Sequence, residues 1–73
     1  MNIGEAVTAM RSGKSVQRAG WNGKGMYVAL QVPDQHSKMT ESYVYMKTAQ
    51  GGLIPWLCSQ ADLLADDWSV VSN

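Results

Sequence analysis

The sequence has few of the residues that hold very small proteins together. Its 73 residues include one cysteine, one histidine, two prolines and no phenylalanine. A single cysteine excludes an internal disulfide, and one histidine with one cysteine excludes the usual zinc ligand sets. We therefore expect no metal and no cofactor. A chain this short buries only about 60% of the surface that its unfolded form exposes, so self-association is expected to add to its stability.

Charged residues and long apolar runs are scarce as well. Six basic and six acidic residues cancel, and charged residues make up 16% of the chain, against about 25% in globular proteins generally. Non-specific nucleic-acid binding depends on neutralised phosphates, so we expect no nucleic-acid partner. No apolar run approaches the ~20 residues that span a bilayer, and no signal peptide is visible. The sequence predicts a soluble, intracellular protein with one domain over residues 1–73.

The first element that the sequence does predict is an amphipathic helix. Asn2 and Glu5 have the spacing of a capping box. One buried face follows at helical spacing: Ile3, Ala6, Val7 and Met10. Gly13 supplies the stop.

The remaining chain shows the alternation and turn signals of short strands. Strands are expected at residues 15–18, 26–32, 43–48, 53–54 and 68–71. The glycine pair at 51–52 predicts a hairpin turn, and residues 33–42 form a long polar loop. Capping spacing at Ser59 and Asp62 predicts a short helical turn over 59–65. The fold class is therefore α+β, with the N-terminal helix packed on a small, largely antiparallel β-sheet and a short helical turn before the last strand.

No residue pattern points to catalysis. His36 lies in a polar loop, where nothing in the spacing provides the oriented partner of a general base. Cys58 follows two apolar residues, which favours a buried, inert thiol over a nucleophile. Asp66 and Asp67 are adjacent, so their side chains point apart and make a poor carboxylate pair. We expect a protein that is not an enzyme.

The most informative segment is the glycine-rich loop at residues 20–25, GWNGKG. Glycines let the backbone approach a ligand closely and offer several positive-φ positions, and successive N–H groups can form an anion-binding nest. Trp21 offers a flat face to a base, and Asn22 can donate to and accept from a base or ribose edge. Arg18 and Lys24 flank the loop as candidate phosphate ligands. The alternative is a hairpin turn whose tryptophan folds back onto the core.

Other aromatic residues leave two interpretations open. Trp68 follows two aspartates and either lines a pocket for a polar, aromatic ligand or anchors the core, and Trp56 is more typical of a core anchor. Tyr43 and Tyr45 lie on one strand face, where they serve either sheet packing or an oligomer surface.

Three segments carry a resemblance to a known family: NIGEAVTAM, RAGWNGKGMYVALQVPD and YVYMKTAQGGLIPWLCSQADLLADDW. They resemble small phage and prophage proteins once filed as a domain of unknown function, the Thoeris anti-defence proteins of the second type (Tad-two). The resemblance runs from about Asn2 to Val71, and GWNGKGM and SQADLLADDW are its specific parts.

The resemblance implies a sponge that binds and sequesters a cyclic ADP-ribose isomer, the signal of Thoeris immunity, without cleaving it, in the cytoplasm of the infected bacterial host. It implies a homo-oligomer, typically a tetramer built as a dimer of dimers, with ligand pockets between protomers. Some members also hold cyclic dinucleotides at other sites. Carried onto this sequence, the family pattern gives the following ligand-binding residues: Trp21, Asn22, Gly23 and Trp68 in the pocket, Arg18 and Lys24 toward phosphate, and Ser59, Gln60, Asp62 and Asp66 toward ribose or base.

Two other functions compete with this one. The first is a small phage module that binds a host protein or a nucleic acid, although the neutral charge counts against nucleic acid. The second is a hydrolase that degrades the signal, which the missing pair of base and nucleophile disfavours.

Overall fold

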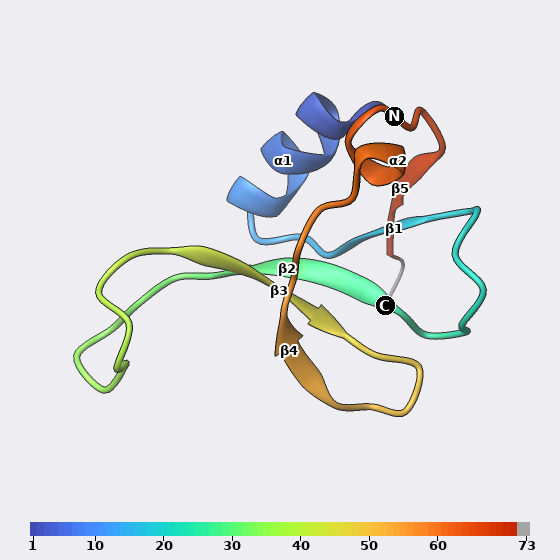
Figure 1. Cartoon of the computed structure of the whole chain (residues 1–73). Coiled ribbons are helices and arrows are strands. Elements are labelled where there is room, and N and C mark those ends of the chain that lie inside the picture. Colours follow the sequence, from blue (N-terminus) through green and yellow to red (C-terminus); the bar gives the residue numbers. More distant parts are fainter. Residues whose placement is uncertain (72–73) are drawn as a thin grey trace.

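The computed structural model describes residues 1–71. Within this range the elements follow the order α1 (Ile3–Arg11), β1 (Val16–Arg18), β2 (Tyr27–Gln31), β3 (Tyr43–Lys47), β4 (Leu53–Pro55), α2 (Gln60–Leu63) and β5 (Trp68–Val70). The strands form one sheet of order β4-β3-β2-β1-β5, in which neighbouring strands are antiparallel. Helix α1 packs against β5, β1 and β2, and α2 lies close to the start of β5 (Figure 1). The predicted α+β class is confirmed.

Helix α1 begins with the predicted capping box. The Glu5 N–H donates to Asn2 Oδ1 at 2.8 Å, and the Asn2 N–H donates to Glu5 Oε1 at 3.0 Å. Ala6 and Met10 are buried as expected, but Val7 is 36% exposed. The prediction for Val7 is wrong for the single chain, because α1 packs against the core through Ala6 and Met10, with Ile3 and Ala9 beside them, and Val7 lies outside this contact.

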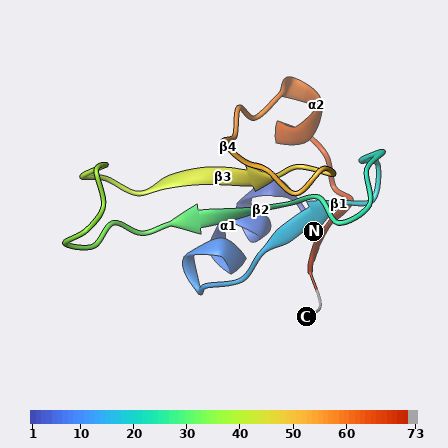
Figure 2. The ribbon, with the colours of Figure 1, turned by 90° about the horizontal axis from the view of Figure 1, so that it is seen from below.

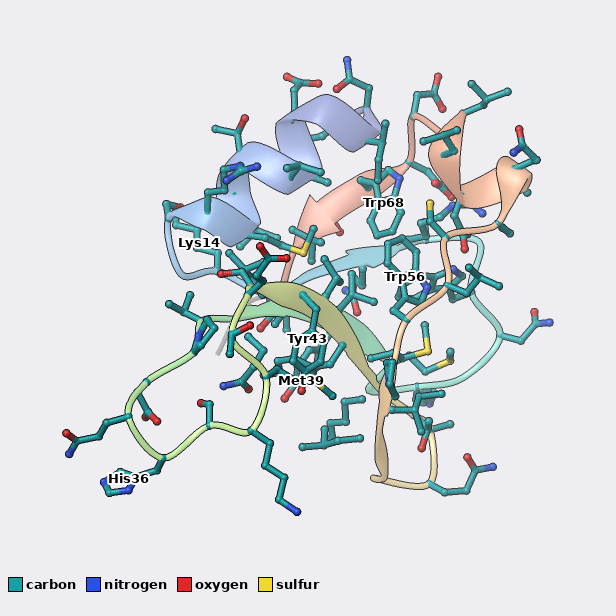
Figure 3. The ribbon with its side chains drawn as sticks, turned by 60° about the vertical axis from the view of Figure 1, so that its left-hand side comes forward. Lys14, His36, Met39, Tyr43, Trp56 and Trp68 are labelled. Atoms are coloured by element: carbon teal, nitrogen blue, oxygen red, sulfur yellow. The ribbon has the colours of Figure 1, made fainter. Side chains whose placement is uncertain are left out.

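The core of the described chain is small and rich in tryptophan. Its fully buried cluster consists of Ala6, Met10, Val16, Val28 and Trp68. The rings of Trp21, Trp56 and Trp68 meet edge to face, with centroids 5.3 to 6.5 Å apart, a geometry that aromatic pairs favour. Figure 3 shows Trp56 and Trp68 side by side. Trp68 is only 2% exposed, so in the single chain it anchors the core.

The sheet has one covered face and one open face. Direct pairing of Val28 with Met46 and of Ala29 with Tyr45 puts alternate residues of β2 and β3 on the same side. Val28 and Met46 face the core, whereas Ala29 and Tyr45 lie on the opposite side. Figure 2 shows β2 and β3 running side by side. The predicted alternation in β3 is therefore confirmed.

The strand ends differ slightly from the predicted ones. Strand β2 is one residue shorter at each end than residues 26–32, and β5 ends at Val70. Strand β4 continues through Pro55, which is possible because β4 is an edge strand and needs no donor on its outer side. Pairing with a neighbour decides these ends, and the sequence of one strand does not contain that information.

The two glycine turns behave differently. The hairpin turn predicted at the glycine pair 51–52 is confirmed and spans residues 48–52, since the Thr48 N–H donates to the Gly52 carbonyl at 2.8 Å and Gly51 has a φ of +92°. In the loop at 19–26 only Gly25 has a positive φ, at +78°, where the sequence suggested several. The polar loop 33–42 projects from the body, with His36 on its outer side (Figure 3). Among residues 1–71, no helix is long and apolar enough to cross a membrane.

Candidate functional site

The site is built where the start of the glycine-rich loop meets α2 and β5. Ser59 caps α2, and its hydroxyl oxygen accepts the Asp62 N–H at 3.0 Å, as the sequence predicts. This cap ends the preceding extended chain and starts the single turn that carries Asp62. Asp62 is 9% exposed and is buried beside the tryptophan cluster.

Arg18, Asp62 and Asp67 form an ion network, which we call the carboxylate clamp. Arg18 at the end of β1 donates from Nη1 to Asp62 Oδ1 at 2.8 Å and from Nε to Asp67 Oδ1 at 2.8 Å. The side chains are 19%, 12% and 31% exposed, respectively, for Arg18, Asp62 and Asp67. Hydrogen bonds between ionised groups are shorter and stronger than neutral ones, and partial burial reduces their screening by water.

The clamp also holds the loop that follows β1. Asp67 Oδ2 accepts the main-chain N–H of Gly20 at 2.9 Å. Asp62 Oδ1 accepts the indole N–H of Trp21 at 3.1 Å, while the main-chain carbonyl of Asp62 accepts the indole N–H of Trp68 at 3.1 Å. Two consecutive loop residues are thus tied to chain segments that lie more than forty residues away.

The charges in the clamp stabilise one another. Burial alone raises the pKa of Asp62, but hydrogen bonds from Arg18 and Trp21 outweigh burial and hold the pKa of this carboxyl below its ordinary value. The pKa of Asp67 is lowered chiefly by its hydrogen bond from Arg18. The same bonds, that with Asp67 first, raise the pKa of Arg18 above its usual range. All three groups are therefore ionised at neutral pH.

The predicted ligand residues fall into three groups. The clamp joins Arg18 and Asp62 to Trp21 and Trp68 in one connected cluster. Asn22 and Lys24 are exposed at the tip of the same loop, and Gly23 is half-buried between them. Ser59 and Gln60 are exposed at the start of α2, and Asp66 is exposed between α2 and β5.

Gly23 fits its place closely. A Cβ at this position would lie 2.8 Å from the Ala49 Cβ and 2.6 Å from the Met26 sulfur. The loop therefore rests against the 48–52 hairpin, and only a glycine permits this approach.

Asp67 is the residue of the site that the sequence reasoning missed as a binding or positioning group. The adjacent pair is unsuitable as a catalytic carboxylate pair, and of its two members only Asp66 is among the ligand-binding residues that the resemblance implies. The spacing of these aspartates in the sequence does not indicate that Asp67 contacts Arg18. The contact follows from the pairing of β1 with β5, in which Arg18 lies opposite Trp68. The register of two strands that are distant in sequence was the missing information.

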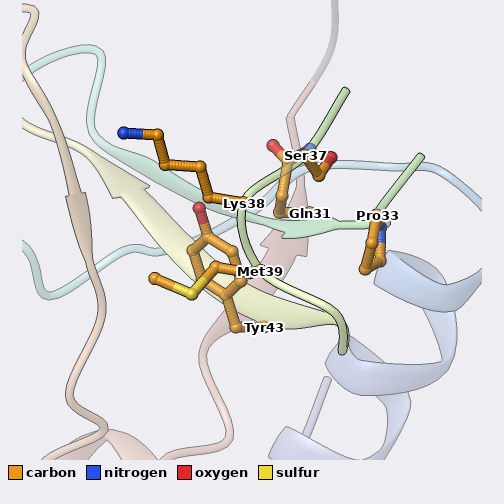
Figure 4. A pocket seen from close by; sticks show the side chains of 6 residues that line it. All are labelled: Gln31, Pro33, Ser37, Lys38, Met39 and Tyr43. Atoms are coloured by element: carbon orange, nitrogen blue, oxygen red, sulfur yellow. The ribbon is translucent and has the colours of Figure 1, made fainter. Parts of the chain in front are cut away.

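Two adjoining hollows in the surface are lined by residues other than the predicted ligand-binding ones. One has a volume of about 230 Å³ and is lined by Gln31, Pro33, Ser37, Lys38, Met39 and Tyr43 (Figure 4). The other, of about 470 Å³, lies beside Met39 and Tyr43 and extends to Pro55. Both border the open face of the sheet, which the alternation of Tyr43 and Tyr45 pointed to without showing a hollow.

Neither His36 nor Cys58 supplies an activated group at this site. His36 is exposed on loop 33–42 and points away from Trp56 and Trp68 (Figure 3). Burial, with a smaller contribution from the Asp62 charge, raises the pKa of the Cys58 thiol, which keeps it protonated at neutral pH. Among residues 1–71, no group of three histidine, cysteine or acidic side chains is placed to hold a metal ion.

Comparison with known proteins places the chain in a family. The model of the Tad2-like family, described as the Thoeris anti-defense 2-like domain, matches residues 1–71. The chain is also 33% identical over 85 aligned positions to a protein named Thoeris anti-defense 2 from Bacillus phage SP01, with 99% of this chain and 96% of the phage protein covered. The match includes both the glycine-rich loop and the segment from Ser59 to Trp68. The chain therefore belongs to the Thoeris anti-defense 2-like family.

Proposed function

We propose that this protein is a sponge for the signal of Thoeris immunity. It binds a cyclic ADP-ribose isomer in the cytoplasm of the infected bacterial host and sequesters it without cleavage. The observation that carries the proposal is the family match, which extends over residues 1–71 and includes the loop built around Trp21. We include cyclic dinucleotides, held at other sites, as further candidate ligands.

The loop at 19–26 offers groups that suit such a nucleotide. Trp21 is half-buried and held by its indole N–H, so a planar base can stack on it with little loss of side-chain freedom. Asn22 is exposed and can donate to or accept from a base or ribose. Lys24 is exposed and takes part in neither ion pair of the described chain, so its ammonium is available to a phosphate. Arg18, by contrast, is already occupied by two carboxylates.

Capture without chemistry is supported by the distribution of reactive groups. A general base must lie within hydrogen-bond reach of the proton that it abstracts. His36 is on the projecting loop and the Cys58 thiol is protonated, so neither supplies an activated group beside Trp21. The clamp carboxylates are ionised but engaged by Arg18.

We further propose that the pocket is completed by a second copy of the chain in a homo-oligomer, a tetramer built as a dimer of dimers. Small-molecule sites are concave, whereas the loop tip of the single chain is exposed. Beside the site, Leu57 is 91% exposed and Leu64 is 81% exposed. Large apolar side chains this exposed are typical of contact surfaces when they cluster.

A capture-and-release assay tests the function. The purified protein is incubated with cyclic ADP-ribose isomers and cyclic dinucleotides, freed of unbound ligand and heated, and the released compounds are identified by chromatography. Release of an intact cyclic ADP-ribose isomer is the expected result. A linear product would show an enzyme instead. If every nucleotide stays in the unbound fraction, the proposal fails, and a host protein or nucleic acid becomes the partner to seek.

Variants at the loop tip connect the result to the site. Trp21→Ala is expected to abolish capture, but it also removes ring contacts to Trp56 and Trp68. Asn22→Ala and Lys24→Ala change exposed side chains, so they are expected to weaken capture while the fold is preserved. Glu41→Gln is the control, because it alters an exposed charge on loop 33–42. Unchanged capture by folded Trp21, Asn22 and Lys24 variants would place the site elsewhere.

A further inference from the structure

We infer that Arg18, Asp62 and Asp67 are positioning residues, which hold the Trp21 loop in the orientation that receives the ligand. The inference rests on the proposed function for its ligand, and on the geometry of the clamp for the rest. The family match does not assign this role to any of the three.

The carboxylate oxygen atoms of the clamp accept hydrogen bonds from the loop directly. Asp62 Oδ1 accepts both Arg18 Nη1–H and the Trp21 indole N–H. Asp67 divides its two oxygens, Oδ1 accepting from Arg18 Nε–H and Oδ2 from the Gly20 main-chain N–H. Arg18 thereby fixes the orientation of both carboxylates, and each carboxylate fixes one loop residue. The clamp therefore contacts two consecutive residues of the loop, Gly20 and Trp21.

The glycine-rich loop has much conformational freedom to lose when it binds a ligand. Residues 20–25 contain three glycines, and glycine loses more conformational freedom on ordering than any other residue. Main-chain hydrogen bonding of this strand ends at Ala19, whose N–H donates to the Asp67 carbonyl at 3.2 Å, one residue before the loop begins. The clamp orders the loop before any ligand arrives, which lowers the entropy cost of binding.

The net charge of the clamp favours one orientation of an anionic ligand. One guanidinium between two carboxylates leaves the clamp with a net charge of one negative unit. An anionic phosphate is therefore repelled from the base of the loop and attracted to Lys24 at its exposed tip. The clamp thus favours one orientation of a nucleotide, with its phosphates toward the tip and its uncharged part toward Trp21.

The structure provides an internal control for the test. Asp62 accepts the Trp21 indole N–H with its carboxylate, but accepts the Trp68 indole N–H with its main-chain carbonyl. In the full-length Asp62→Asn variant only the first acceptor is changed. In a ¹H–¹⁵N spectrum we expect the Trp21 indole signal to shift and its proton to exchange faster with water, while the Trp68 indole signal stays near its wild-type position.

The ligand measurement completes the test. With cyclic ADP-ribose, and with whichever isomer or dinucleotide the wild type captures, Asp62→Asn is expected to raise the Kd at least about tenfold, or about 1.4 kcal/mol. Glu41→Gln removes one exposed negative charge, as Asp62→Asn removes a buried one, and is expected to leave the Kd within about twofold of the wild-type value. If Asp62→Asn fails to fold, Asp67→Asn replaces it, with the Gly20 amide signal as its readout.

Each outcome decides a separate question. A Trp21 signal that does not move in folded Asp62→Asn overturns the inference, whatever the affinity. A shifted Trp21 signal with an unchanged Kd also overturns it, because the clamp would then be structural only. If the wild type binds no nucleotide at all, the proposed function fails and the ligand part of the inference fails with it, while the indole and amide signals still report whether the clamp orders the loop.

Discussion

The carboxylates of the clamp make stability depend on acidity. The folded chain lowers the pKa of Asp62 and of Asp67 below the ordinary value of about 3.9. A carboxyl with a lowered folded pKa stabilises the fold above its unfolded pKa, and this stabilisation is lost as pH falls through the folded pKa. We expect the thermal midpoint, followed by circular dichroism, to stay level between about pH 7 and 5 and to fall below about pH 4.

Matched variants assign this acid sensitivity to the clamp. Asp67→Asn and Asp62→Asn should each be less stable than wild type at neutral pH and should show a shallower fall in acid. Glu41→Gln, whose exposed carboxyl lies outside the clamp, should retain the wild-type profile. An equally steep fall in both aspartate variants would show that other carboxyl groups cause the acid transition.

The close packing of Gly23 leads to a second prediction at the scale of the residue. Gly23→Ala would bring its Cβ to 2.8 Å from the Ala49 Cβ, and overpacking of this kind costs about 1–3 kcal/mol. We expect the urea midpoint to fall and Trp21 fluorescence to change as the loop shifts. Gly52→Ala is the control, because its Cβ would meet only the Thr48 hydroxyl at an ordinary 3.5 Å. Equal stability of the two variants would contradict the close packing of the loop.

At the scale of the element, the cap of α1 is the clearest local signal. Removing an N-cap side chain costs about 1 kcal/mol, so Asn2→Ala should lower the free energy of unfolding by about that amount. Glu5→Gln should have a much smaller effect, because glutamine still accepts the Asn2 N–H in a capping box. Urea unfolding followed by circular dichroism measures both. A loss in Glu5→Gln equal to that in Asn2→Ala would mean that charge near the helix end is the dominant factor.

Elements with local signals were the ones that the sequence predicted well. The caps at Asn2 and Ser59 and the turn at Gly51 depend on residues within a few positions, and all three were confirmed. Val7 was placed in the core wrongly, because its burial depends on how wide a surface the sheet offers to α1. The partnership of Arg18 with Asp67 joins residues 49 positions apart. It follows from strand register, which no local pattern encodes.

The same division applies to the candidate site. The loop around Trp21 was recognisable from its glycines and its family resemblance. The alternative that its tryptophan folds back onto the core agrees with the packing of Trp21 against the core cluster, but the hydrogen bond from its indole to Asp62 had no signal in the sequence. Trp68 could be read from sequence as a pocket wall or as a core anchor, and its burial in the single chain supports the second. Residues with two plausible uses are separated only by their partners in three dimensions.

At the scale of the whole molecule, the chain is built around a very small core. The buried cluster contains two residues of α1 and three of the strands, while Leu53, Leu57 and Leu64 are each more than 60% exposed. A domain of this length gains limited stability from one core. Burial of the exposed leucines between copies would add apolar contact area without changing the fold of each chain.

The proposed oligomer therefore predicts that stability depends on protein concentration. Association stabilises the folded state by mass action, and about a hundredfold dilution weakens one association step by about 2.7 kcal/mol. We expect the thermal midpoint to fall on dilution and light scattering to give a mass several times the 8.0 kDa of one chain. Leu57→Ser, at a side chain that touches little in the single chain, should lower the mass if this surface is shared between copies. A midpoint that is independent of concentration, together with a monomer mass, would leave the Trp21 loop open to solvent in solution and would remove the second copy from the proposed pocket.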